Sequence, residues 1–213
     1  MKSTKMKRAY KIIIIAILII AALWGAFYTE TLTERQQRER MNQYNPEQLV
    51  EALMKDSLET LHKRAVSIEE LAQGIATDHP SFATHHGSVL GIGSPIFYVV
   101  EGACNGMKLG EDGELLATVD GVQLTIPTKY IFGNTARDAS GWFTIDNYKN
   151  TMEFNAVSAA MNAYIGKQLQ KNHLLQIATD SMATRRISFI GAVSVPSESN
   201  QVDKLTLIPY QIK

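Results

Sequence analysis

An uncharged apolar run near the N-terminus constrains this chain more than any other feature of its sequence. Residues 12–28 read IIIIAILIIAALWGAFY, and 17 such residues are just long enough to cross a hydrocarbon core of about 30 Å as a helix. Five basic residues and no acidic one precede the run, at Lys2, Lys5, Lys7, Arg8 and Lys11. Because basic flanks stay in the cytoplasm, the pattern predicts a cytoplasmic tail over 1–11, a transmembrane anchor over 12–28 and a body outside the membrane.

A cleaved signal peptide is the alternative to a retained anchor. Signal cleavage needs small residues at the −3 and −1 positions, and the bulky Trp24 and Phe27 interrupt most frames. Small residues at 21–22 and 25–26 keep cleavage open. The anchor is favoured, which predicts a single-pass protein of the inner (cytoplasmic) membrane with its C-terminal domain in the periplasm or outside the cell.

The charge of the chain excludes one class of partner. Basic and acidic residues number 21 each, so without its first 11 residues the chain has 16 basic residues against 21 acidic and a net charge of −5. Nucleic-acid binding depends on neutralising phosphates with basic side chains, so no nucleic-acid partner is expected. The lone Cys104 likewise excludes an internal disulfide framework.

Helical patterns dominate residues 29–76. The first part, 29–45, is strongly polar and typical of either a helical stalk or a solvated linker. Asn45 begins a helix with leucines at helical spacing, and Ser67 opens a second helix with a capping box. We therefore interpret 29–76 as a helical stalk or support. Residues 77–95 are rich in glycine, proline and serine and are expected to form a loop.

From residue 96 onward the apolar period changes to two. Strands are expected at 96–100, on both sides of the Asp120-Gly121 turn within 115–126, and at 187–195 and 205–212, with a long helix at 149–171 between the third and fourth strands. This order predicts an α+β fold in which 77–213 forms a small OB-like antiparallel β-barrel, either closed or partly open. A small α+β sandwich would have the same order of elements.

The segment from Gly133 to Asn162, GNTARDASGWFTIDNYKNTMEFNAVSAAMN, is distinctive. With Gly102, Gly191-Ala192 and the final LTLIPYQI, it resembles a bacterial family of predicted periplasmic lipoproteins, the domain of unknown function family 2291. The resemblance implies an exported, membrane-tethered protein of unknown activity, in a family whose members are often encoded near sugar ABC-transport systems. This sequence departs from a lipoprotein because no cysteine follows the apolar run, so a transmembrane helix would replace the lipid.

Six residues of this segment are candidates for binding a ligand or partner: Asn134, Thr135, Arg137, Asp138, Trp142 and Asn150. A guanidinium group holds carboxylates, phosphates or sugar hydroxyls, and a neighbouring carboxylate orients it. An indole ring suits stacking on a sugar. The alternative is that Arg137 and Asp138 only pin the turn into the long helix and that Trp142 is simply buried.

No catalytic or metal pattern accompanies these residues. Cys104 has no neighbouring base, and the spacing of His79, His85 and His86 matches no metal motif. No catalytic residue, metal or cofactor is therefore expected. The prediction is a membrane-anchored extracytoplasmic binding or accessory module. Its expected partners are the membrane (through 12–28), an ABC-transport component or a small polar ligand such as a sugar. An exported hydrolase and a structural protein of envelope assembly stay open as alternatives.

Overall fold

The computed structural model describes residues 15, 17, 20, 44–90, 95–171 and 186–213. The chain forms two compact units, Met1–Asn45 and Pro46–Lys213. In the first unit Ile15, Ile17 and Ile20 are helical and exposed. The remainder of the predicted tail, membrane helix and polar segment up to residue 43 lies outside the described residues. In the part that is described, no helix is both long enough and apolar enough to span a bilayer.

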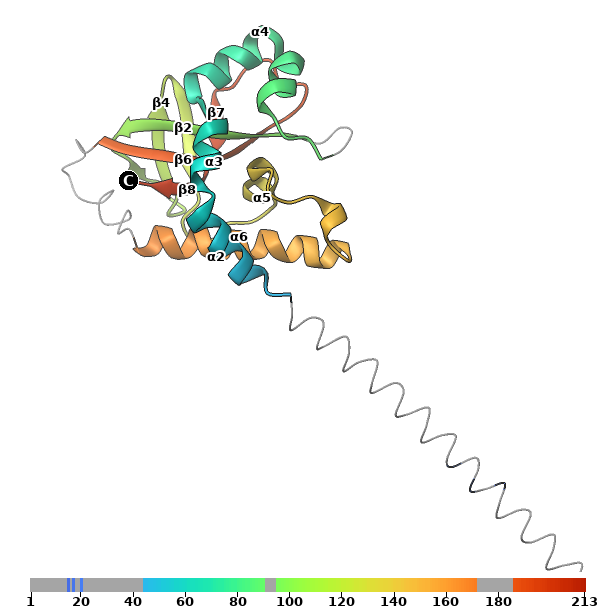
Figure 1. Ribbon diagram of the computed structural model, residues 1–213. Helices are drawn as coiled ribbons and strands as arrows, with labels where there is room; N and C mark the ends of the chain where they lie inside the picture. Colours follow the sequence, from blue (N-terminus) through green and yellow to red (C-terminus); the bar gives the residue numbers. More distant parts are fainter. Residues whose placement is uncertain (1–14, 16, 18–19, 21–43, 91–94, 172–185) are drawn as a thin grey trace, which may run out of the picture. The chain divides into compact units, whose positions relative to one another are not determined.

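The second unit mixes helices and strands, which confirms the predicted α+β class (Figure 1). Its helices are α2 (Pro46–Asp56), α3 (Leu58–Arg64), α4 (Ile68–His86), α5 (Thr135–Ser140), the 3-10 turn η1 (Ile145–Asn147) and α6 (Thr151–Lys171). Its strands are β1 (Val66–Ser67), β2 (Ile96–Asn105), β3 (Lys108–Leu109), β4 (Leu115–Val119), β5 (Val122–Ile126), β6 (Arg186–Val195), β7 (Lys204–Thr206) and β8 (Ile208–Ile212). Helix α6 lies between the third and fourth predicted strands, as expected.

The strands form two four-stranded sheets, with the orders β1-β2-β6-β8 and β3-β4-β5-β7. Most neighbours are antiparallel, but β1 runs parallel to β2, and β5 runs parallel to β7. The strands therefore do not form a closed, purely antiparallel barrel as predicted, because both sheets are mixed and the described strands do not close. Closing a sheet requires its end strands to pair along their length, whereas β1 and β3 have two residues each.

The hairpin of β4 and β5 follows the prediction closely. Val119 pairs with Val122, and Asp120 and Gly121 between them have φ angles of 51° and 85°. Two successive positive φ angles are those of a primed two-residue turn. Alternate residues of both strands are buried, so the period-two pattern reports the inward face correctly.

The last apolar run of the chain is divided between the two sheets. Leu205 pairs with Leu124 in one sheet, whereas Ile208 pairs with Ala192 in the other. Leu207, between the two pairings, is fully buried. The predicted final hairpin therefore consists of β6 and β8 alone, and β7 joins a strand much earlier in the sequence.

Helix α4 occupies much of the segment that we expected to be a loop. It begins after the predicted cap Ser67, is interrupted at Asp78 and continues to His86. Asp78 Oδ1 accepts a hydrogen bond from the Ser81 N–H at 3.1 Å, and Pro80 lies in the turn that follows. An aspartate cap followed by proline in the first turn is a helix start. The loop prediction is wrong here because Asp78 and Pro80, which are typical of loops by composition, are spaced as a helix start.

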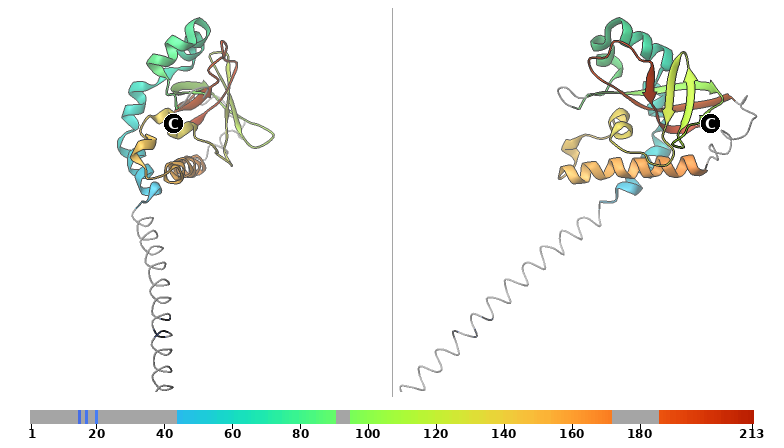
Figure 2. Two further views of the ribbon diagram at one scale, coloured as in Figure 1. Left: turned by 90° about the vertical axis from the view of Figure 1, so that its right-hand side faces the viewer. Right: turned by 180° about the vertical axis from the view of Figure 1, so that it is seen from behind.

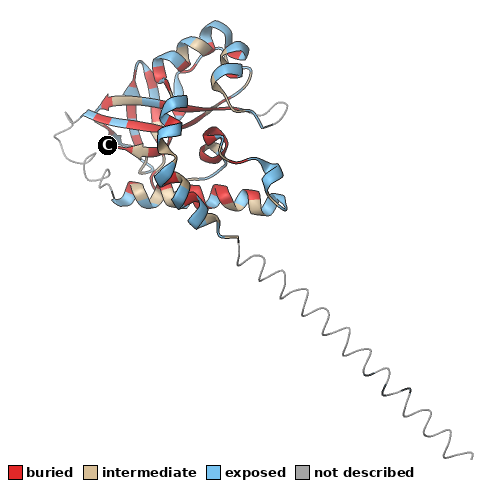
Figure 3. Cartoon of the chain, viewed as in Figure 1, coloured by how far each residue is buried: buried red, intermediate tan, exposed pale blue. Residues whose placement is uncertain are grey.

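Helices α4 and α6 lie on opposite sides of the strands in every view (Figures 1 and 2). Helix α2 packs against α6 and buries Val50 and Met54. Short α5 contacts β2, β6, β8 and α6. It is buried almost throughout, whereas buried and exposed positions alternate along α6 (Figure 3). The distinctive segment 133–162 therefore contains a buried helix, α5, and the first part of a partly exposed helix, α6.

Candidate functional site

A buried ion pair anchors helix α5. Arg137 and Asp138 are 3% and 7% exposed, and Arg137 Nε donates to Asp138 Oδ1 at 2.6 Å. Arg137 Nη1 also donates to the Phe154 carbonyl at 3.1 Å and to Asn155 Oδ1 at 3.2 Å. The guanidinium carbon lies 3.6 Å from the centre of the Phe154 ring. These contacts tie α5 to the first turns of α6.

The electrostatics of this pair follow from its burial. Burial raises the pKa of the Asp138 carboxyl, because an ionised carboxylate loses its hydration inside the protein. The hydrogen bond and the charge of Arg137 act in the opposite direction. The neighbouring guanidinium is therefore what favours the ionised carboxylate at this buried position.

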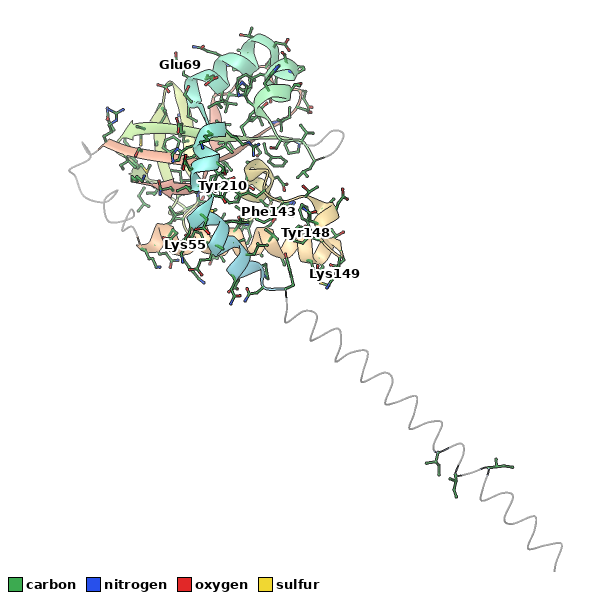
Figure 4. All side chains as sticks on the ribbon, viewed as in Figure 1. Lys55, Glu69, Phe143, Tyr148, Lys149 and Tyr210 are labelled. Carbon is green, nitrogen blue, oxygen red and sulfur yellow. The ribbon has the colours of Figure 1, made fainter. Side chains whose placement is uncertain are left out.

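Two further side chains hold α5 from other parts of the chain. Arg64 donates to the Ser140 carbonyl at 2.6 Å and to Ser88 Oγ at 3.1 Å. The Tyr210 hydroxyl donates to the Ala136 carbonyl at 2.6 Å, and burial raises the pKa of this phenol. Tyr210 reaches from β8 toward α5 (Figure 4). Side chains from α3 and β8 therefore hold α5 near both of its ends.

The other predicted site residues take local structural positions. Asn150 Oδ1 accepts a hydrogen bond from the Glu153 N–H at 2.9 Å, which caps the start of α6. Trp142 is half-buried, and its Nε1 donates to Thr60 Oγ1 at 3.3 Å. Thr135 is the first residue of α5 and is half-buried.

A groove of about 530 Å³ lies between residues 129–134 and one face of α6, and we call it the α6 groove. Its α6 side is lined by Ser158, Ala159, Asn162, Ala163, Gly166, Lys167 and Gln170. The side chains at 158, 159, 163 and 166 are small or absent, which leaves room next to the helix. The volume is within the usual range of small-molecule sites.

One buried polar group beside the groove lacks a partner among the described residues. Ser158 is 6% exposed, and its hydroxyl makes no hydrogen bond within the part of the chain that the structure describes. A serine inside a helix can donate to the carbonyl four residues earlier. Here that carbonyl is Phe154 O, which already accepts a hydrogen bond from Arg137. An unpaired buried hydroxyl is costly unless something else pairs with it.

Two aromatic rings lie on the opposite side of the groove. Tyr130 and Phe132 line it and are 73% and 78% exposed. Their rings are nearly parallel, with an interplanar angle of 7° and centroids 6.0 Å apart. Asn162 Nδ2 donates to the Gly133 carbonyl at 3.0 Å, which ties this segment to α6. The groove thus pairs exposed flat rings with a buried hydroxyl.

Sequence reasoning found little of this groove. Among the six predicted site residues, Asn134 lines it, and the other five lie elsewhere. Tyr130, Phe132 and Ser158 were missed. Two sequence signals were available: two aromatic residues at alternate positions, and small residues at helical spacing along α6. Both patterns are also common in protein cores. Only the folded structure brings the two segments together.

Reactive side chains elsewhere are arranged as structural groups. Cys104 is buried, and burial raises the pKa of its thiol, which favours the unreactive neutral form. His79 is buried too, with Nε2 2.9 Å from the Tyr98 hydroxyl and Nδ1 2.8 Å from the Ser199 carbonyl. Within the described residues, no three histidine, cysteine or acidic side chains gather as metal ligands.

Comparison with known protein families identifies the family of this chain. A family model described as "Predicted periplasmic lipoprotein (DUF2291)" matches residues 17–213. The chain belongs to this family. The family resemblance inferred from the sequence is therefore confirmed, and the function of the family is unknown.

Among solved structures, the chain is similar to an OB-fold protein from Thermotoga maritima. The TM-score is 0.66 with 15% identical residues, over 80% of this chain and 98% of that one. At this identity the likeness shows the fold alone, so the OB-type part of the prediction is supported although the barrel is not closed. The comparison with curated proteins found no match.

Proposed function

We propose that this member of the family is a membrane-anchored extracytoplasmic binding module, and that the α6 groove holds its ligand. The observation that carries the proposal is Ser158, a residue of the groove lining whose buried hydroxyl has no hydrogen-bond partner among the described residues. A ligand hydroxyl or anion in the groove would supply the missing hydrogen bond. Arg137, paired with Asp138, donates to the Phe154 carbonyl, which is the acceptor that the Ser158 hydroxyl would otherwise use.

The anchor in this proposal is a single transmembrane helix over residues 12–28. The basic tail 1–11 would remain in the cytoplasm, and the unit Pro46–Lys213 would lie in the periplasm or outside the cell. The description of the family as periplasmic supports this topology. A C-terminal reporter that is active only after export should be active on the full chain, and a reporter active only in the cytoplasm would overturn the topology.

The ligand class in this proposal is a small polar molecule such as a sugar, and an ABC-transport component is the proposed protein partner. A volume of about 530 Å³ and a lining of amides, a hydroxyl and aromatic rings support a small polar ligand. Cys104 and His79, two side chains that could serve a hydrolase, are buried core groups and so offer no support for that alternative.

The test is to block the groove with a bulky side chain and to identify the bound molecules that the blocked protein no longer retains. The full chain is purified in detergent as wild type, as Ala163→Trp and as a matched control, Ala76→Trp, which places the same ring on an exposed position of α4. Mass spectrometry of bound small molecules and co-purifying proteins should show a species retained by wild type and control but lost from Ala163→Trp. Identical sets in all three, with unchanged melting, would reject the groove as the site.

A further inference from the structure

We propose that the α6 groove is selective for an anionic sugar, meaning a pyranose ring that carries a carboxylate or a phosphate. This inference rests on the proposed function of the groove as a ligand site and adds the charge of the ligand. It combines the charge of the lining, the flat rings on one side and the unpaired hydroxyl on the other.

The charge of the lining is positive. Lys129 and Lys167 line the groove and are both exposed, and none of the described residues in its lining is acidic. Lys167 also lies near Glu51, but that carboxylate accepts a hydrogen bond from Lys55 at 2.8 Å. The Lys129 ammonium lies next to Gly113, and Lys167 lies near Glu51 as well as the groove, so the positive excess is that of two lysines in a described lining without an acidic residue. Such an excess favours an anion. This local excess is notable because the chain beyond its first 11 residues has a net charge of −5.

The aromatic rings favour a ligand with a flat apolar face. Tyr130 and Phe132 present nearly parallel rings and are mostly exposed. The C–H face of a pyranose packs on such rings, and burying them behind a ligand removes apolar surface from water. A small inorganic anion would leave both rings exposed, so the lysines alone do not explain the site.

The remaining polar groups match sugar hydroxyls. The amides of Asn134, Asn162 and Gln170 line the groove, and each amide side chain both donates and accepts hydrogen bonds. Neighbouring hydroxyls on a sugar ring need partners of this kind. Ser158 adds a buried hydroxyl that lies deeper than the exposed lysines. The ligand would therefore place its ring between α6 and the aromatic pair, with its charge toward the lysines.

The test compares three probes that share one ring. D-glucose, D-glucuronate and D-glucose 6-phosphate are titrated into the full chain in a detergent without a sugar headgroup, with binding followed by ligand-observed NMR. At least one of the two anions should bind about tenfold more tightly than glucose. Which anion binds tells a carboxylate ligand from a phosphate ligand, and either result supports the proposal.

Substitutions of lining residues test whether the preference for an anionic sugar arises in the groove. The double change Lys129→Gln and Lys167→Gln should abolish the preference for the anion. The matched control Lys204→Gln, an exposed lysine on β7, should keep it. Ser158→Ala should weaken binding without lowering the melting temperature, since the hydroxyl has no partner among the described residues. A purely structural role for Ser158 would leave binding unchanged.

Two outcomes overturn the inference. Equal binding of glucose and both anions removes the charge selectivity but leaves the groove as a sugar site, so the proposed function stands. Failure of all three probes to bind also overturns the inference. The co-purification experiment with Ala163→Trp then decides separately whether the groove binds anything.

Discussion

Replacing Arg137 with alanine tests whether the buried ion pair is a structural anchor. The side chains of Arg137 and Asp138 are 3% and 4% exposed, and they are joined at 2.6 Å. Arg137→Ala removes the charge that compensates a buried carboxylate, together with the hydrogen bonds to Phe154 and Asn155. Breaking a buried pair from one side costs about 3–5 kcal/mol. We expect a loss of this size in the free energy of unfolding near neutral pH.

The loss should depend on pH. Burial already raises the pKa of the Asp138 carboxyl, and removing Arg137 removes the interactions that oppose this rise. A carboxyl whose pKa is higher in the folded than in the unfolded protein binds a proton more readily when folded. Ionisation of Asp138 therefore costs stability above its folded pKa, and the cost disappears as pH falls toward its unfolded value of about 4. The destabilisation by Arg137→Ala should shrink as Asp138 becomes protonated.

The assay is urea unfolding of residues 44–213, which include the compact unit Pro46–Lys213, at about pH 7.5 and about pH 5. Arg186→Ala, an exposed arginine, is the control and should change the free energy of unfolding by less than about 0.5 kcal/mol. The double change Arg137→Met with Asp138→Leu removes both charges, so it should cost much less than Arg137→Ala alone. A loss below about 1 kcal/mol for Arg137→Ala, or the same loss at both pH values, would refute the ion-pair reasoning.

Three further predictions concern other positions. Gly166→Ala should stabilise the protein by about 0.5–1 kcal/mol, measured by melting, because a helical Cβ at this position meets nothing within 4 Å; a lower melting temperature would contradict this. Gly191→Ala should destabilise it by about 1–3 kcal/mol in the same assay, because its Cβ would lie 2.8 Å from the Ile208 carbonyl oxygen and 2.7 Å from Leu207. Cys104 should react with a thiol reagent only upon unfolding, because it is buried and its thiol pKa is raised; rapid labelling of the native protein would show that the thiol is accessible.

Features that depend on near neighbours could be predicted from the sequence. The β4–β5 hairpin follows from alternating apolar residues around Asp120-Gly121, whose positive φ angles suit the turn. The start of α4 follows from Ser67, whose hydroxyl accepts the Glu70 N–H at 3.0 Å. In such cases the residues that determine the structure lie within a few positions of one another. The apolar run at 12–28 is another local signal, and its role as an anchor stays a prediction.

The candidate site depended on partners that are remote in sequence. Arg64 contacts the Ser140 carbonyl 76 residues away, and Tyr210 contacts the Ala136 carbonyl 74 residues away. No local pattern reveals that such partners bury α5, so Arg137 could equally be read as a ligand contact or an anchor. Strand pairing also depends on partners that are remote in sequence, because β7 pairs with β5 rather than with its neighbour in the chain.

The α+β class, the apolar N-terminal run and the family could be predicted from the amino-acid sequence, because composition, short-range periodicity and a contiguous motif carry them. The folded chain was needed to learn that the sheets are open, that Arg137 is buried, and that the aromatic segment faces Ser158 across a groove. The physical reason is that burial and strand pairing are properties of the whole packed chain. A side chain has one set of local neighbours, whereas its solvent exposure depends on elements that fold against it from elsewhere.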